Sequence, residues 1–268
     1  MNQFARVGRM ADQRPHGDNA EARAIAAALR DAIHSGEYNA GDKLPSERVL
    51  AATYHGARNT ARAAIQELIQ EGLVRPEHGR GYFVRERPRW MRFGRLRYTT
   101  PMRAVTTHGP FGAEARAQGK TPRVDVRNVE RIPSPVDVAE RLDIEPGADV
   151  VRRENWYYAD EIPMQIGITF IPWSIAKGTA LTKAENLGKR ALYGRLEDLG
   201  YTIANIREEV TARPATREEA EGLEMPAGVP IIDLWHTGMT AENKPFEVTN
   251  FRMRADYSAL DYDMPVEY

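Results

Sequence analysis

Apolar residues recur at helical spacing near the start of the chain. Within residues 21–38, apolar side chains recur at i, i+3 and i+4 spacing, at Ile25, Ala28, Leu29, Ala32 and Ile33. This spacing places an apolar stripe along one side of a helix, and it predicts an amphipathic helix that packs against a core. Gly36 marks the end of this helix, because glycine readily adopts the left-handed conformation that closes many helices.

A short second helix is predicted over residues 47–54. Ser46 is a favourable N-cap, since its hydroxyl group can accept a hydrogen bond from a free backbone N–H of the first turn. The side chains of Val49, Leu50 and Ala52 are expected to face the core.

A third helix is predicted over residues 58–71, and Gly72 stops it. Ala57 stands at its N-cap position and has no side chain that could cap the helix. The apolar stripe of this helix is formed by Ala61, Ala64, Ile65, Leu68 and Ile69.

Two short strands follow, over residues 73–75 and 81–84, with a glycine-containing tip at residues 78–81 between them. Three helices with a tight turn between the second and third, followed by a hairpin, describe a winged helix-turn-helix. In that arrangement the third helix enters the major groove of DNA.

The second part of the chain contains an internal repeat. Residues 136–147 resemble residues 217–228, a period of 81 positions with a single-residue gap, and each copy continues into an apolar strand, a turn and a second strand. The predicted hairpins pair residues 150–158 with 163–171 and residues 230–239 with 246–254.

A helix over residues 192–199 separates the two copies, and Thr216 with Glu219 forms a capping box at the helix of the second copy. These signals predict an α+β domain in which helices cover one side of an antiparallel sheet. Duplicated halves commonly leave a cleft where they meet, and clefts bind ligands.

Charge is distributed unevenly along the chain. Residues 1–103 carry a net charge of +7 and residues 104–268 a net charge of −8, which together give the overall −1. A basic N-terminal part favours a polyanionic partner such as double-stranded DNA. Arginine binds guanine edges and asparagine binds adenine edges, so the start of the third helix is suited to base contacts. The alternative is an ordinary solvated helix face.

Other features of the composition limit the function. The chain has no cysteine, no Gly-x-Ser-x-Gly, phosphate-loop or dinucleotide motif, and no histidine spacing typical of a metal site. No apolar run approaches the roughly 20 residues that span a bilayer, and the polar N-terminus lacks a secretory signal. We therefore expect a cytoplasmic protein with no membrane association, no catalytic or metal site and no cofactor.

Several motifs in the first part resemble the GntR family of bacterial regulators. They are Gly41-Asp-Lys-Leu-Pro-Ser-Glu-Arg48, Arg58-Asn-Thr-Ala-Arg62, Glu71-Gly-Leu-Val74 and Gly79-Arg-Gly-Tyr-Phe-Val84, in this order. The resemblance implies a homodimer on a palindromic operator, with contacts from the third helix and the wing. The residues that would contact DNA are Arg48, Arg58, Asn59, Thr60, Arg62, His78, Gly79 and Arg80.

The second part resembles the UTRA domain, the ligand-sensing half of the HutC branch of this family, which is related in fold to chorismate lyase. Further matches are Leu192-Tyr193 with Leu196-Glu197 and Gly200, and Pro245-Phe246-Glu247. At positions where phosphosugar-binding members carry two arginines, a glutamate and a tyrosine, this chain has Asn155, Tyr157, Gly167 and Met253.

Only Glu247 is retained from that phosphosugar site, so a less charged effector with more apolar surface is expected. Arg153 shares a strand face with Asn155 and Tyr157. The candidate effector-binding residues are Arg153, Asn155, Tyr157, Gln165, Thr169, Glu247, Thr249 and Met253.

The predicted organisation is a flexible N-terminal arm at residues 1–18, a DNA-binding domain at 19–86, a linker at 87–104 and an effector-binding and dimerisation domain at 105–268. The arginines of the linker alternate with aromatic residues. They form either a phosphate-contacting arm or a connection whose aromatics dock on the second domain, and the second interpretation is favoured.

Together these features predict a repressor that a small-molecule effector releases from DNA. Two alternatives stay open: a ligand-independent dimeric repressor, and an enzyme resembling chorismate lyase, which rests on fold analogy alone.

Overall fold

A computed structural model describes residues 18–85, 91–94, 98, 108–185, 187–188, 190–226 and 228–263. The chain divides into two compact units, with the main boundary after Pro88. The predicted flexible arm lies outside the described residues, apart from Asp18, where the first helix begins. Within the described part of the chain, no helix combines the length and apolar character needed to cross a membrane.

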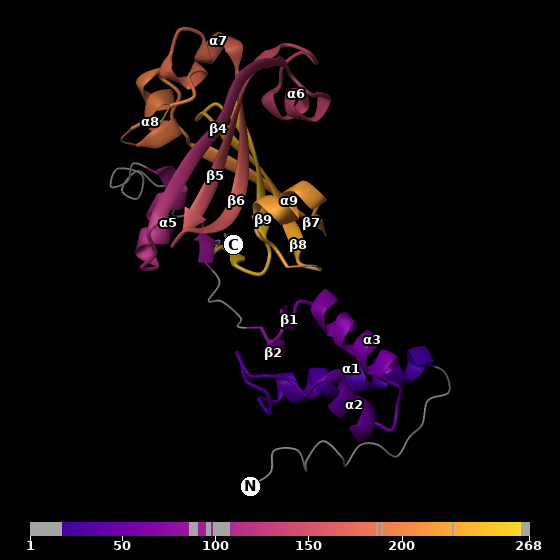
Figure 1. The fold of residues 1–268 in the computed structure, drawn as a ribbon. Helices are drawn as coiled ribbons and strands as arrows, with labels where there is room; N and C mark the ends of the chain where they lie inside the picture. The colour runs from indigo at the N-terminus through magenta and orange to yellow at the C-terminus, as the bar shows by residue number, and fades with distance from the viewer. Residues whose placement is uncertain are drawn as a thin grey trace, which may run out of the picture. The chain divides into compact units, whose positions relative to one another are not determined.

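The first unit contains three helices and a two-stranded hairpin (Figure 1). The strands pair antiparallel, with Val74 opposite Val84 and Glu77 opposite Gly81. This confirms the predicted winged helix-turn-helix. The elements are α1 Asp18–His34, α2 Glu47–Thr53, α3 Arg58–Gln70, β1 Val74–Glu77 and β2 Gly81–Val84.

The core of this unit joins all three helices to the hairpin, and it includes Leu29, Leu50, Ile65 and Leu68. Ser46 caps α2 by accepting a hydrogen bond from the Val49 N–H, whereas α3 begins at Ala57 without a side-chain cap. Both observations agree with the sequence prediction.

The orientation predicted for α2 was wrong at one residue. Ala52 is exposed, whereas Glu47, Leu50, Ala51 and Tyr54 are buried or half-buried. These four residues follow the helical spacing i, i+3, i+4 and i+7. The inward face therefore begins with a carboxylate, which an analysis of apolar positions alone does not detect.

The second unit is built on a six-stranded sheet in the order β4-β5-β6-β9-β8-β7, in which all neighbouring strands are antiparallel. The strands are β4 Pro122–Pro133, β5 Asp149–Ala159, β6 Ile162–Pro172, β7 Asn205–Pro214, β8 Pro230–Met239 and β9 Pro245–Arg254. The predicted α+β class and antiparallel sheet are confirmed.

The helices cover both faces of this sheet, so the prediction that they cover one side was wrong. Tyr157 and Trp156 are successive residues of β5 and point to opposite faces. The ring of Phe111 in α5 packs on Tyr157, and Gly222 of α9 lies against Trp156. The elements outside the strands are α5 Gly109–Ala117, α6 Val136–Leu142, α7 Trp173–Ala176, η4 Ala180–Thr182, α8 Ala191–Asp198 and α9 Arg217–Gly222.

The internal repeat corresponds to two halves of the sheet. The run β4-α6-β5-β6 is followed by the similar run β7-α9-β8-β9, and β6 and β9 meet at the centre. The capping box of Thr216 and Glu219 is present at the start of α9. The two outer strands, β4 and β7, were not predicted, although residues 122–127 alternate apolar and charged side chains in the period of a strand.

Part of the predicted linker belongs to the second unit. Strand β3, Met91–Gly94, pairs in parallel with β10, Ser258–Asp261. The side chains of Phe93 and Tyr98 are buried in the apolar clusters of this unit. These two aromatics therefore dock on the second domain, as the favoured interpretation of this segment requires.

Candidate functional sites

The residues proposed to contact DNA gather on α2, the start of α3 and the hairpin tip. Seven of the eight are exposed: Arg48, Arg58, Asn59, Arg62, His78, Gly79 and Arg80. Thr60 differs, because only 4% of its surface is exposed and it packs with the buried residues of α3. Its side chain is therefore not presented to a groove in the way that the other seven residues are.

Glu47 connects the three elements of this surface. Its Oε1 accepts hydrogen bonds from Arg62 Nε at 2.9 Å and from the Tyr82 hydroxyl at 3.0 Å. Its Oε2 accepts from Arg58 Nε at 2.9 Å and from Arg62 Nη2 at 3.1 Å. One buried carboxylate in α2 thus holds two arginines of α3 and a tyrosine of the wing.

The electrostatics of this cluster favour the ionised carboxylate. Hydrogen bonds from Arg62 outweigh the effect of burial and, with those from Arg58 and Tyr82, lower the pKa of Glu47 to about 2. Hydrogen bonding to Glu47 raises the pKa of Arg62 in turn. Glu47 is also the first residue of α2, where a negative charge interacts favourably with the helix dipole.

The pairing with Glu47 leaves much of both guanidinium groups available. The side chain of Arg58 is 69% exposed and that of Arg62 is 53% exposed. Arg58 uses only Nε, so both of its Nη groups remain free among the described residues, and the Nη1 group of Arg62 is also free. These outer N–H groups are the ones that bind guanine O6 and N7 end-on.

The tip of the hairpin is suited to a narrow groove. Gly79 has a φ of +72°, a conformation in which a larger residue would be strained. Arg80 forms an ion pair with Glu77 and lies over the ring of Phe83 at 5.3 Å from its centroid. The wing therefore presents a small residue between the exposed side chains of His78 and Arg80.

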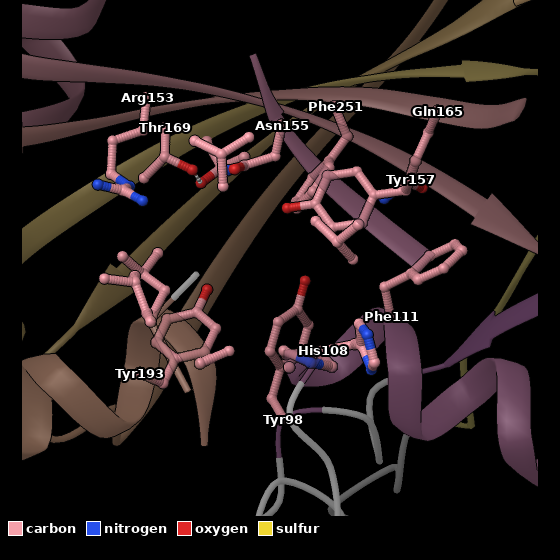
Figure 2. A pocket seen from close by; sticks show the side chains of 18 of the residues that line it. Tyr98, His108, Phe111, Arg153, Asn155, Tyr157, Gln165, Thr169, Tyr193 and Phe251 are labelled. Atoms are coloured by element: carbon pink, nitrogen blue, oxygen red, sulfur yellow. Dashed lines mark hydrogen bonds between the residues drawn. The ribbon is translucent and has the colours of Figure 1, made fainter. Parts of the chain in front are cut away.

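The second unit contains a cavity of about 100 Å³ on the face of the sheet covered by α5 and α8 (Figure 2). Side chains from β5, β6 and β9 form its floor, and Tyr98, Phe111 and Tyr193 close it from the opposite side. This volume exceeds that of a single water molecule.

Seven of the eight residues predicted to bind an effector line this cavity: Arg153, Asn155, Tyr157, Gln165, Thr169, Thr249 and Met253. Alternation along the strands brings them together, since residues two apart share a face. Glu247 does not line the cavity. It is fully buried and accepts hydrogen bonds from the hydroxyl groups of Tyr193 and Thr249, at 2.9 Å and 3.0 Å.

Glu247 belongs to a buried network next to the cavity. His236 Nε2 lies 3.0 Å from Glu247 Oε1, and His236 Nδ1 lies 3.2 Å from Glu208 Oε1. The ring of Tyr98 stacks on His236 with centroids 4.5 Å apart. Burial by itself lowers the pKa of His236, but Glu247 and Glu208 together outweigh it and raise this pKa.

Sequence reasoning missed the aromatic part of the cavity. Phe251 lies on β9 between Thr249 and Met253, on the same face, so the period of the strand could have identified it. The ring of Phe111 packs on that of Tyr157 with centroids 5.1 Å apart. The centroids of the Tyr157 and Phe251 rings are 6.2 Å apart. Tyr98, Phe93 and His108 come from distant segments and carried no such signal.

Gly167 leaves space for two aromatic rings that line the cavity. A Cβ atom at Gly167 would lie 2.9 Å from Tyr157 Cε2 and 3.0 Å from Phe251 Cε1. The two rings thus occupy the space above the position where phosphosugar-binding members carry a glutamate. Aromatic packing therefore fills the space beside Gly167.

Comparison with known proteins identifies the family of each part of the chain. A model of the UTRA domain matches residues 117–258, more than half of the chain, and a model of bacterial regulatory proteins of the gntR family matches residues 21–84. The chain is a GntR-family transcriptional regulator with a UTRA domain. It belongs to a family of regulators and not of enzymes, which confirms the expectation from the sequence.

The regulator resembles proteins of similar length. It is 28% identical to a helix-turn-helix transcriptional regulator of Streptomyces coelicolor, over 91% of this chain and 92% of the relative. It is 26% identical to the transcriptional repressor NagR of Bacillus subtilis, over 87% and 90%. The fructoselysine utilization operon repressor of Escherichia coli is also 26% identical, over 88% and 90%.

Solved structures show the same two-part organisation. The crystal structure of a GntR-family regulator superposes with a TM-score of 0.69 at 25% identity, covering 92% of the regulator and 98% of that chain. PhnF from Mycobacterium smegmatis superposes with a TM-score of 0.55 at 21% identity, over 91% of the regulator and 100% of that chain.

Proposed function

We propose that the regulator is a homodimeric repressor that binds a palindromic operator and is released by a small-molecule effector. The observation that carries the DNA-binding part is the exposed cluster on α3, in which Glu47 holds Arg58 and Arg62. Both Nη groups of Arg58 and the Nη1 group of Arg62 remain free among the described residues. Two relatives of similar length, NagR and the fructoselysine operon repressor, are named repressors, and this supports repression over activation.

The effector part of the proposal rests on the cavity of the UTRA domain. Seven residues chosen from the sequence surround it, and its lining combines aromatic rings with Arg153, Asn155 and Gln165. This lining suits a ligand with more apolar surface than a phosphosugar. The proposed site of action is the cytoplasm, where bacterial operator DNA is found.

Operator binding is tested by fluorescence anisotropy with the DNA upstream of the regulator's own gene. Arg58→Ala and Arg62→Ala should each weaken binding by about 1–3 kcal/mol and relax specificity at one operator position. A variant that weakens binding equally on all sequences would make that arginine a phosphate contact. Footprinting should show a two-fold symmetric site, and light scattering of the complex should show two chains per operator.

The alternative of a ligand-independent repressor makes a different prediction. An effector that releases the regulator must bind the free protein more tightly than the operator complex, by the same factor by which it weakens operator binding. Calorimetry of a cavity ligand with and without operator measures both factors. Equal affinities in the two titrations would favour the ligand-independent repressor.

A further inference from the structure

Arg153 is a buried cation at one end of the effector cavity. It lies on β5 with only 1% of its surface exposed, and its side chain lines the cavity beside Thr169 (Figure 2). A buried charge is costly unless a partner of opposite charge compensates it. The partners of this guanidinium group therefore decide what the cavity can hold.

Its partners are backbone carbonyls. Nη1 donates to Leu181 O at 2.6 Å and to Lys183 O at 2.8 Å, and Nη2 donates to Glu185 O at 3.4 Å. None of the described carboxylates forms an ion pair with it. Burial lowers the pKa of Arg153, an effect that Tyr157 and Glu185 oppose, and an arginine remains charged all the same. Its charge is thus solvated by dipoles without being neutralised.

Two of its donors remain unused. A guanidinium group has five N–H groups, of which three are taken by the carbonyls. The remaining two, on Nε and Nη2, have no partner among the described residues. Nε and Nη2 form one edge of the planar group, and this edge binds a carboxylate through two parallel hydrogen bonds.

The other lining residues limit the charge of a ligand. Among the described residues around the cavity, the ionisable ones besides tyrosines are Arg153, His108 and Glu185. Burial lowers the pKa of His108, so its ring is neutral near pH 7, and Glu185 is exposed. A single cation matches one negative charge, which favours a carboxylate over a phosphate dianion.

The rest of the cavity is apolar and aromatic. Figure 2 shows Arg153 and Thr169 at one side and Phe111 with Tyr157 at the other, with Asn155 between them. The rings of Phe111, Tyr157 and Phe251 form one cluster at that far side. A ligand that reaches both ends carries an anionic group and an apolar, ring-sized body.

We propose that the effector is a monocarboxylate with an apolar ring or a body of similar size, whose carboxylate binds the Nε and Nη2 edge of Arg153. This rests on the proposed function of the cavity and adds the chemical class of its ligand. The position differs from those of the two arginines of phosphosugar-binding members, which correspond to Asn155 and Tyr157 here.

The test uses the full-length protein and matched probes. Benzoate, phenylacetate and 3-phenylpropionate are titrated by calorimetry beside benzamide, phenylacetamide and 3-phenylpropionamide, which keep the shape and lose the charge. At least one carboxylate should bind about tenfold or more tightly than its amide, because a charged hydrogen-bonded pair is stronger than a neutral one. The proposal is overturned when no acid of this set binds more tightly than its amide.

Variants locate the contact. Arg153→Met should abolish the preference for the acid, and Arg153→Lys should retain only part of it, because lysine lacks the planar fork. Arg152→Met is the matched control. Arg152 is the adjacent residue, points to the other face and is already paired with Glu130 and Glu154 at 3.3 Å and 2.7 Å. An unchanged preference in folded Arg153→Lys and Arg153→Met, or its loss in Arg152→Met, contradicts the proposal.

Operator binding separates this inference from the proposed function. An amide that binds in the cavity as tightly as its acid and releases DNA would support the regulator's function and overturn the carboxylate inference. A carboxylate that binds through Arg153 but leaves operator affinity unchanged would support the inference and contradict release by this effector. Should Arg153→Met fail to fold, the comparison of acid and amide affinities on the unaltered protein still tests whether the cavity prefers a carboxylate.

Discussion

Each unit of the regulator buries a charged side chain at a binding surface, Glu47 in the first unit and Arg153 in the second, and the two side chains have different partners. In the DNA-binding unit, the carboxylate of Glu47 is neutralised by Arg58 and Arg62 and accepts a further hydrogen bond from Tyr82. In the sensing unit, the partners of the Arg153 guanidinium group among the described residues are all backbone carbonyls.

This difference indicates what each surface is built to do. A DNA-binding surface meets a partner of known charge, so its arginines are best fixed in advance, and preorganisation lowers the entropic cost of binding. A ligand shifts an equilibrium only by its differential affinity for the two states. A sensor therefore needs a group whose interactions are satisfied with the ligand bound and unsatisfied without it. An uncompensated charge provides that differential affinity.

Replacing Glu47 tests the first half of the comparison, and it should give the largest effect. Glu47→Gln leaves two arginines and a tyrosine without their common acceptor, which should cost about 1–3 kcal/mol of unfolding free energy and weaken operator binding. Chemical denaturation and anisotropy measure the two losses.

Glu71→Gln is the matched control for Glu47→Gln. It removes the same charge from a partly exposed ion pair with Arg30, so its cost should stay between about 0 and 1 kcal/mol. Because the folded pKa of Glu47 is lowered from 4.5 to about 2, its contribution is fully present above pH 4.5 and is lost as the pH falls toward 2. A variant with the stability and acid sensitivity of the native protein would show that Glu47 does not organise this surface.

The next largest effect is expected from a substitution beside the aromatic rings of the sensing cavity. In Gly167→Ala, the added methyl group would lie 2.9 Å from Tyr157 Cε2 and 3.0 Å from Phe251 Cε1, which is closer than van der Waals contact. Such overpacking typically costs about 1–3 kcal/mol of unfolding free energy. The rings must shift toward the cavity, so binding of an apolar ligand should weaken, while operator affinity in its absence should stay the same.

Gly178→Ala is the control for this substitution, because no described atom beyond its own chain neighbours lies within 4 Å of its Cβ position. Its φ of +76° adds local backbone strain but leaves the cavity unchanged. Equal ligand affinities in the two glycine variants would contradict the role assigned to the space above Gly167.

The sequence predicted those parts of the molecule that depend on local order. Caps, glycine turns and strand alternation identified the three helices of the first unit and the two hairpins of the second. The resemblance to the UTRA domain, combined with strand alternation, gave seven of the residues around the cavity, among them Asn155 and Gln165. These signals are short in range, since a capping residue acts within one turn and a strand face repeats every second residue.

The features that the sequence did not reveal depend on contacts between distant segments. Glu47 was noted only as part of a motif, because its role depends on Arg62 and on Tyr82, which is 35 positions away. Tyr98 and Phe111 approach the cavity from segments outside the repeat. Predicting helices on both faces of the sheet also requires the order of the strands. The two-residue period of a strand does not contain this information.

The network beside the cavity predicts a smaller effect. Tyr193→Phe removes the hydroxyl group that lies 2.9 Å from Glu247 Oε1 and 3.0 Å from His236 Nε2. Glu247 keeps His236 and Thr249 as partners, so the loss should be about 1 kcal/mol of unfolding free energy. A loss of ligand affinity well beyond the loss of stability would instead assign this hydroxyl group to ligand binding.

The protonation of His236 gives the smallest and most specific prediction. Glu208 of β7 and Glu247 of β9 lie on either side of its ring, while Tyr98 and Tyr193 cover it, and the two carboxylates raise its pKa above 6.5. Because the folded pKa exceeds the unfolded one, His236 stabilises the protein fully below pH 6.5 and loses this contribution as the pH rises through the folded pKa. Unfolding free energy should therefore decline from pH 6.5 upward, and His236→Gln should reduce that slope. NMR identifies the His236 resonance as the one that is missing from His236→Gln. A pKa at or below 6.5 for this resonance would show that burial outweighs the two carboxylates. Near pH 7, Arg153 would then be the single buried cation next to the cavity among the described residues.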